Sequence, residues 1–137
     1  MQNTIEEIEQ EFWGAPLKDA SYLITTCHNL RRKNIDAFTI EDFRILIGQN
    51  IGLEILISKA IQILNKDILA EGDFYEGDLL KSVLTSRKDF WKVHPDLKNE
   101  MTRIYEENIG SLDELDTTDQ VREGIKEAYE EFKKEIT

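Results

Sequence analysis

The sequence predicts an all-α protein, a compact bundle of about eight helices that residues 1–137 form as one domain. Apolar residues recur at spacings of three and four along most of the chain, which is the period of amphipathic helices. Only two prolines and seven glycines interrupt the pattern, and short alternating runs bounded by turn residues are few. A chain of this length can bury enough apolar surface for one core without a covalent staple.

The first two helices are expected in the N-terminal third. One spans residues 4–12 after a cap at Asn3 or Thr4 and stops before Gly14 and Pro16. Its inner face is Ile5, Ile8 and Phe12. The other follows a cap at Asp19 or Ser21, and its inner face is Leu23, Cys27 and Leu30. The bases at its end, Arg31, Arg32 and Lys33, are explained by the negative end of the helix dipole.

The middle of the chain is expected to form a hairpin of two packed helices. Thr39 caps a helix over 40–47, and Asp42 at its third position acts like the acid of a capping box. Residues 48–52 begin and end with glycine and form a tight joint, after which the second helix spans 53–66. Apolar residues are dense on both helices, so this hairpin is the predicted centre of the fold.

The C-terminal half is predicted as an ordered acidic loop followed by four helices. The loop spans 67–78, a segment with five acids and no base. The first helix starts at Gly77 or Asp78 and ends at Leu84, and Ser86 caps the next one. The inner face of the latter is Phe90 and Trp91.

Two longer helices complete the prediction. Pro95 starts a helix to about residue 107, because proline suits the first helical turn. Its inner face is Leu97, Met101, Ile104 and Tyr105. A linker follows Gly110, and Thr117 or Thr118 caps a last helix that runs to the terminus. Its inner face is Val121, Ile125, Tyr129, Phe132 and Ile136.

The charge balance limits the class of partner. The chain has 17 Lys+Arg and 28 Asp+Glu, a net charge of -11, which repels phosphate backbones and anionic lipids. A basic protein is therefore the favoured partner, although acidity for solubility alone is an equally simple interpretation. No apolar run is long enough for a membrane span, and the single cysteine excludes an internal disulfide framework. We expect a cytoplasmic protein.

The search for catalytic and metal-binding residues predicts no enzyme and no cofactor. Cys27 faces the predicted core, and its neighbour His28 points elsewhere around the helix, so the two do not form a nucleophile–base pair. His94 is isolated in the sequence. The acidic loop matches a calcium loop at several positions, but Leu69 replaces a ligand at position three and Asp78 replaces the bidentate Glu. No phosphate-binding glycine motif occurs.

The acidic loop is the predicted partner-binding segment. Acids and aromatic residues alternate there, an arrangement that supplies an anchor and charges for the Lys and Arg residues of a partner. The predicted contacts are Asp67, Glu71, Asp73, Tyr75, Glu76 and Asp78. The alternative is that Phe74 and Tyr75 fill the core while the acids are merely solvated. The second-choice surface is the C-terminal acids Glu123, Glu127, Glu130 and Glu131.

Several segments resemble the immunity proteins of bacterial contact-dependent growth inhibition (CDI) systems. The similarity covers residues 12–91 and rests most on two runs, RILIGQNIGL at 44–53 and LAEGDFYEGDLL at 69–80. It is also present in FWG at 12–14, SYLITTCHNLRRK at 21–33 and FTIEDFR at 38–44. Beyond Pro95 nothing specific is shared.

The resemblance implies a cytoplasmic protein without catalytic activity that binds and neutralises the C-terminal toxin domain of a CDI effector. The family's toxins include nucleases, and a ribonuclease-like domain fits an acidic inhibitor that occludes a basic active site. Two alternatives stay open: an adaptor for another basic protein, and a hydrolase that uses clustered carboxylates. Gln49 and Asn50 either contact a partner or, as we favour, bond to backbone groups freed at the helix joint.

Overall fold

The computed structural model describes residues 3–114 and 117–134, and it confirms the all-α prediction. Within these residues the regular elements are nine α-helices and one 3-10 helix, and the sole β feature is an isolated bridge between Glu71 and Glu76. In chain order they are α1 (Ile5–Glu9), α2 (Tyr22–Arg31), η1 (Ile35–Ala37), α3 (Ile40–Gly48), α4 (Leu53–Lys66), α5 (Asp78–Leu84), α6 (Lys88–Lys92), α7 (Pro95–Glu107), α8 (Ile109–Asp113) and α9 (Asp119–Lys133).

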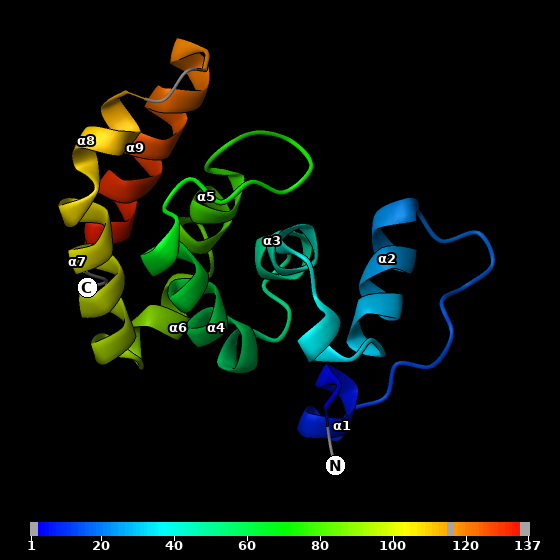
Figure 1. Ribbon diagram of the computed structural model, residues 1–137. Helices are drawn as coiled ribbons and strands as arrows, with labels where there is room; N and C mark the ends of the chain where they lie inside the picture. The colour runs from blue at the N-terminus through cyan, green and yellow to red at the C-terminus, as the bar shows by residue number, and fades with distance from the viewer. Residues whose placement is uncertain (1–2, 115–116, 135–137) are drawn as a thin grey trace.

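The helices form three groups that lie side by side. Figure 1 shows α1 and α2 at one edge, α3 to α6 in the middle, and α7 to α9 at the other edge. Helix α3, seen end-on, packs against α2, α4 and α5, and α5 in turn packs against α9. One hydrophobic cluster passes through all three groups, from Ile5 in α1 to Phe132 in α9. The short helix α5 therefore joins the middle of the molecule to its C-terminal edge.

Side-chain caps start four of the helices as the sequence predicts. The hydroxyls of Thr4, Ser21 and Thr118 accept hydrogen bonds from backbone N–H groups in the first turns of α1, α2 and α9. At α3, Thr39 and Asp42 form a complete capping box, in which each side chain accepts a bond from the other's backbone N–H.

The N-terminal helices differ from the prediction in their exposed residues. Helix α1 stops at Glu9, because Gln10 adopts a left-handed conformation with φ of 57°, and the expected extension to residue 12 is wrong. Phe12 is consequently 62% exposed instead of buried. Leu23 was also expected inside but is exposed, whereas Cys27 and Leu30 are buried as predicted.

The central hairpin is confirmed, but it has a third member. Helix α4 has the predicted bounds and α3 ends at Gly48. Gly52 has a φ of +68°, which suits the joint to α4. Helix α5 packs along α3 as closely as α4 does, and four of its seven residues are buried apolar side chains: Leu79, Leu80, Val83 and Leu84. The centre of the hydrophobic core is thus built on three helices, α3, α4 and α5.

Two predictions in the C-terminal half are wrong. Ser86 does not cap α6; its hydroxyl donates to Val83 O and accepts a bond from Trp91 Nε1 at 2.8 Å. The predicted linker after Gly110 is instead part of α8, an extra short helix. The predicted burial of Ile125, Tyr129 and Phe132 is confirmed. The predicted inner residue Ile136 lies outside the described residues.

Candidate functional site

The acidic loop, residues 67–77, leaves the end of α4 and returns to the start of α5 (Figure 1). Its first residue, Asp67, accepts a hydrogen bond from Leu69 N at 3.0 Å through its side chain. Its last residue, Gly77, donates a backbone hydrogen bond to Leu69 O at 3.3 Å. The backbones of Glu71 and Glu76 form an antiparallel β-bridge across the loop. Backbone hydrogen bonds therefore close the loop at its base.

A single buried carboxylate holds the loop in shape. Asp78 is only 3% exposed. Its Oδ1 accepts a hydrogen bond from Gly72 N at 2.7 Å, and its Oδ2 accepts bonds from Phe74 N at 3.1 Å and Tyr75 N at 3.3 Å. These three N–H groups have no helix or sheet partner, so the carboxylate supplies the acceptors that the turn needs.

Two charged residues of α3, Glu41 and Arg44, contact the loop and Asp78. Arg44 forms an ion pair with Glu41 through two hydrogen bonds, and its Nε lies 3.8 Å from Asp78 Oδ2. The Glu41 carboxylate also accepts a bond from Asp73 N at 2.9 Å. The Arg44 hydrogen bond and the Asp73 N–H lower the pKa of Glu41, while the bond to Glu41 raises the pKa of Arg44. Both groups stay charged at neutral pH.

The structure divides the predicted contact residues into three kinds. Asp67, Glu71, Asp73 and Glu76 are exposed. Tyr75 is half-buried, and burial raises the pKa of its hydroxyl. Asp78 is buried at the start of α5, where its carboxylate positions the loop. Phe74 is exposed and does not fill the core. The Arg44 guanidinium lies 4.4 Å from the centroid of the Phe74 ring.

The second-choice acids lie on α9. Glu123, Glu127, Glu130 and Glu131 are all exposed. Glu131 is shared by two cations: its Oε2 lies 3.6 Å from Lys88 Nζ, and its Oε1 accepts a bond from Lys134 Nζ at 2.8 Å. These contacts lower the pKa of Glu131. The helix therefore offers fewer uncompensated acids than the loop.

A second candidate surface is apolar and lies at the opposite edge of the molecule from α9. Six of the ten large exposed hydrophobic residues in the described chain fall within residues 12–24, on α2 and the loop before it. They form the N-terminal apolar surface: Phe12, Trp13, Leu17, Tyr22, Leu23 and Ile24. Leu17 is 79% and Tyr22 84% exposed. Such a concentration is typical of an interaction site.

A buried arginine fixes the loop that carries this surface. Arg31 is 1% exposed, pairs with Glu9 at 2.7 Å and donates to the backbone carbonyl of Glu11. Its guanidinium lies 4.3 Å from the Trp13 ring centroid, and the Trp13 ring meets His28 edge-on at 5.1 Å. The interpretation of Arg31 as a mere partner of the helix dipole is therefore wrong. Arg31 holds the loop against α2.

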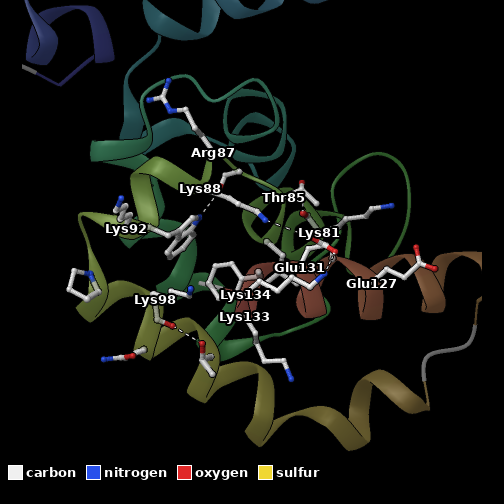
Figure 2. A pocket seen from close by; sticks show the side chains of 18 of the residues that line it. Lys81, Thr85, Arg87, Lys88, Lys92, Lys98, Glu127, Glu131, Lys133 and Lys134 are labelled. Carbon is white, nitrogen blue, oxygen red and sulfur yellow. Dashed lines mark hydrogen bonds and ion pairs between the residues drawn. The ribbon is translucent and has the colours of Figure 1, made fainter. Parts of the chain in front are cut away.

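A third feature is a basic cleft of about 1040 Å³ between α5, α6, α7 and α9. Seven cations line it: Lys81, Arg87, Lys88, Lys92, Lys98, Lys133 and Lys134. In Figure 2 they come from both sides of the cleft, and Lys88, Glu131 and Lys134 meet between the helices. Its floor contains the buried rings of Trp91 and Phe132.

The residues examined for catalysis have structural surroundings. Cys27 is buried, and burial raises the pKa of its thiol. His28 Nδ1 lies 3.2 Å from Gly14 O, and His94 pairs with Glu54 at 2.8 Å. Among the described residues, no three His, Cys, Asp or Glu side chains gather as metal ligands. None of the described helices is both long enough and apolar enough to cross a membrane.

Comparison with known proteins decides the family. The family model described as CDI immunity proteins matches residues 7–101, which is well over half of the chain. This chain belongs to the CDI immunity proteins. The match contains the N-terminal apolar surface and the acidic loop, and it ends within α7. No curated protein and no solved structure matches the chain.

The N-terminal apolar surface and the basic cleft of this immunity protein are not predicted from its sequence. Phe12 and Leu23 have helical spacing and were therefore assigned to the core. The cations of the basic cleft are spread over residues 81–134, so no local run marks them. Asn50, by contrast, has the favoured structural role: its Oδ1 accepts a bond from Arg87 N at 2.7 Å, although that group belongs to the start of α6 and not to the joint itself.

Proposed function

We propose that this protein neutralises a nuclease toxin domain of a CDI effector by covering its cationic active site with the acidic loop. The observation that carries the proposal is the set of exposed carboxylates on a loop whose backbone is fixed from within. A nuclease must present cations to the phosphates of its substrate. A rigid carboxylate surface on the same cations excludes the substrate by direct competition.

The charges around the loop support this role. Residues 67–78 contain no Lys or Arg, and Arg44, the cation beside Asp78, is already paired with Glu41. The exposed acids are thus free to pair with a partner. The net charge of -11 also accelerates the encounter with a basic protein, which helps when an incoming toxin must be bound before it acts.

The N-terminal apolar surface supports a second part of the same contact. Interfaces combine a few buried aromatic and aliphatic anchors with a charged periphery, and the anchors supply most of the affinity. Trp13 and Tyr22 are residue types enriched among such anchors. Because Arg31 holds their loop against α2, little conformational entropy is lost when a toxin domain binds there.

Inhibition by occlusion requires binding and no catalytic step, so we assign the protein no enzymatic activity. The toxin would meet its nucleic-acid substrate in the cytoplasm, and we place the complex there.

The test is calorimetry with the purified C-terminal toxin domain encoded beside this chain, at about 50 mM and about 200 mM salt. We expect an affinity in the nanomolar range or tighter that weakens as salt rises, and loss of toxin activity at equimolar inhibitor. Absence of binding would remove that toxin as the partner and favour the adaptor alternative.

The acidic loop is tested by the triple variant Glu71→Gln/Asp73→Asn/Glu76→Gln. These side chains are exposed and the backbone bonds of the loop do not use them, so the fold is preserved. We expect binding to weaken by about tenfold to a hundredfold. The matched control is Glu100→Gln/Glu107→Gln/Glu114→Gln, which removes the same charge from two exposed positions of α7 and from the exposed residue that follows α8. Equal weakening in both variants would refute a specific role of the loop.

The apolar surface is tested by Leu17→Asp and Tyr22→Asp, each of which places a charge at a highly exposed position. We expect each to weaken toxin binding by about tenfold or more, because a buried anchor contributes about 2 kcal/mol. The control is Val93→Asp, which places the same charge at an exposed apolar residue directly after α6. Unchanged affinity in the first two variants would exclude this surface from the complex.

A further inference from the structure

The basic cleft reverses the charge of the molecule locally. Its lining has seven Lys and Arg residues and two Glu residues, Glu127 and Glu131, which gives 7 minus 2, or +5. The whole chain is -11. The rest of the protein therefore carries -11 minus 5, or -16. Ten of the 17 Lys and Arg residues are spread over that remainder, and the cleft gathers the other seven in one concave region. Concave walls of low polarity focus such a field on whatever enters.

Most of this positive charge is not neutralised by the protein. Glu131 serves both Lys88 and Lys134, and Lys98 lies over the Phe132 ring at 5.7 Å, while Lys133 pairs with Glu130 outside the cleft. Lys81, Arg87 and Lys92 form no ion pair with any carboxylate in the described part of the chain. In a chain with 28 acids these three cations line one cleft without a carboxylate partner, so their repulsion of the other cations there is not offset. A bound polyanion would remove that repulsion.

The composition of the cleft selects the kind of anion. Six of the seven cations are lysines, and lysine binds phosphate as a point charge, whereas protein interfaces are enriched in arginine and depleted in lysine. Single-stranded nucleic acid needs exposed aromatic faces for stacking. Trp91 and Phe132 are buried, and the Trp91 indole donates to Ser86, so neither ring offers one. The cleft thus suits neither an acidic protein segment nor RNA.

We propose that this cleft binds a small polyphosphate, either free or as the phosphate chain of a nucleotide. Lys88 on α6 and Lys98 on α7 contact the phosphates, and Lys134 joins them from the end of α9 (Figure 2). The volume of about 1040 Å³ accommodates such a ligand with part of its hydration shell. The site is independent of toxin binding and of the proposed function.

Calorimetry of the full chain with inorganic tripolyphosphate and with ATP, at about 150 mM salt, tests the proposal. We expect one site with a Kd below about 100 µM for at least one of them. Similar affinities identify the phosphate chain alone as the ligand, and tighter binding of ATP adds a contact between the nucleoside and the apolar floor. Failure of both to bind overturns the proposal, and so does tighter binding of a polyglutamate peptide.

A pair of variants with equal charge ties the binding to the cleft. Lys88→Gln/Lys98→Gln removes one ammonium group from α6 and one from α7, and we expect about tenfold weaker binding or more. Lys59→Gln/Lys66→Gln removes the same charge from two exposed positions on α4 outside the cleft and should change the affinity less than about twofold. Equal losses in both variants would mean non-specific attraction to lysines and would overturn the proposal. Circular dichroism verifies that each variant is folded.

Discussion

The acidic loop and the basic cleft lie at opposite ends of helix α5, and they are built in different ways. The loop is attached to the first residue of the helix, where Asp78 accepts three backbone hydrogen bonds. The cleft begins beside Lys81 and Leu84 in its second half and is completed by side chains of three other helices. One surface depends on a single buried carboxylate, and the other depends on the packing of helices.

This difference has a consequence for function. A loop whose backbone is fixed presents its exposed acids in one arrangement, which suits recognition of one partner surface. The cleft carries long lysine side chains that reorient easily, which suits a small anion of variable shape. The loop should therefore be sensitive to single substitutions in its support, and the cleft should respond only to changes in its charge.

The largest expected effect is that of Asp78→Ala. The substitution leaves three N–H groups of the loop without acceptors and removes the carboxylate beside Arg44, so we expect a loss of about 3 to 5 kcal/mol in the free energy of unfolding. Urea denaturation measures it. Glu76→Ala, at an exposed position of the same loop, should change stability by less than about 0.5 kcal/mol. Similar losses in the two variants would contradict the role given to Asp78.

A smaller effect is expected from Gly72→Ala. A Cβ at this position would collide with the Glu41 carboxylate and lie 3.3 Å from the Glu41 backbone, so the loop must move away from α3 at a cost of about 1 to 3 kcal/mol. Toxin binding should weaken as well, because the exposed acids move with the loop. Gly110→Ala is the control: nothing surrounds that position in α8, and alanine should stabilise the helix slightly.

Acid should loosen the loop before it affects the helices around the cleft. The pKa of Glu41 is lowered chiefly by its hydrogen bond from Arg44, so its contribution to stability is present above the ordinary pKa of 4.5 and is lost as the pH falls through the lowered value. Amide exchange of Asp73, which donates to Glu41, should lose protection as the pH falls through this lowered pKa, while amides of α9 keep theirs. In Glu41→Gln this pH dependence should disappear; its persistence would assign the transition to another group.

The helices that the sequence predicts best are those whose signals are local. Thr39 with Asp42 marks the start of α3, and the dense apolar pattern of residues 53–66 marks α4, because capping and periodicity depend on neighbours in the chain. The end of α1 was mispredicted because Gln10, an ordinary helix former, takes a left-handed conformation. The acidic loop was identifiable from composition, but its internal order depends on Asp78 meeting N–H groups up to six residues away.

Surfaces assembled from distant segments were not predictable in the same way. Arg31 looks like an ordinary base at a helix end, and its burial depends on Glu9, Glu11 and Trp13, which approach it only after the chain has turned back. Four separate helices bring the lysines of the cleft together. Net charge conceals such a feature, since the total of -11 combines a cleft lining of +5 with a remainder of -16.

The smallest expected effect is that of Glu131→Gln, which should strengthen binding in the cleft and leave stability unchanged. Glu131 is exposed and shared between Lys88 and Lys134, so its loss frees two ammonium groups for an incoming phosphate. Polyphosphate binding should strengthen by about twofold to threefold, measured by calorimetry. The thermal midpoint should stay within about 1 °C, because exposed ion pairs add little to stability. The control is Glu123→Gln, on the same helix but outside the cleft lining, which should leave polyphosphate binding unchanged. Equal strengthening in both variants would mean that general electrostatics, and not the release of Lys88 and Lys134, causes the effect.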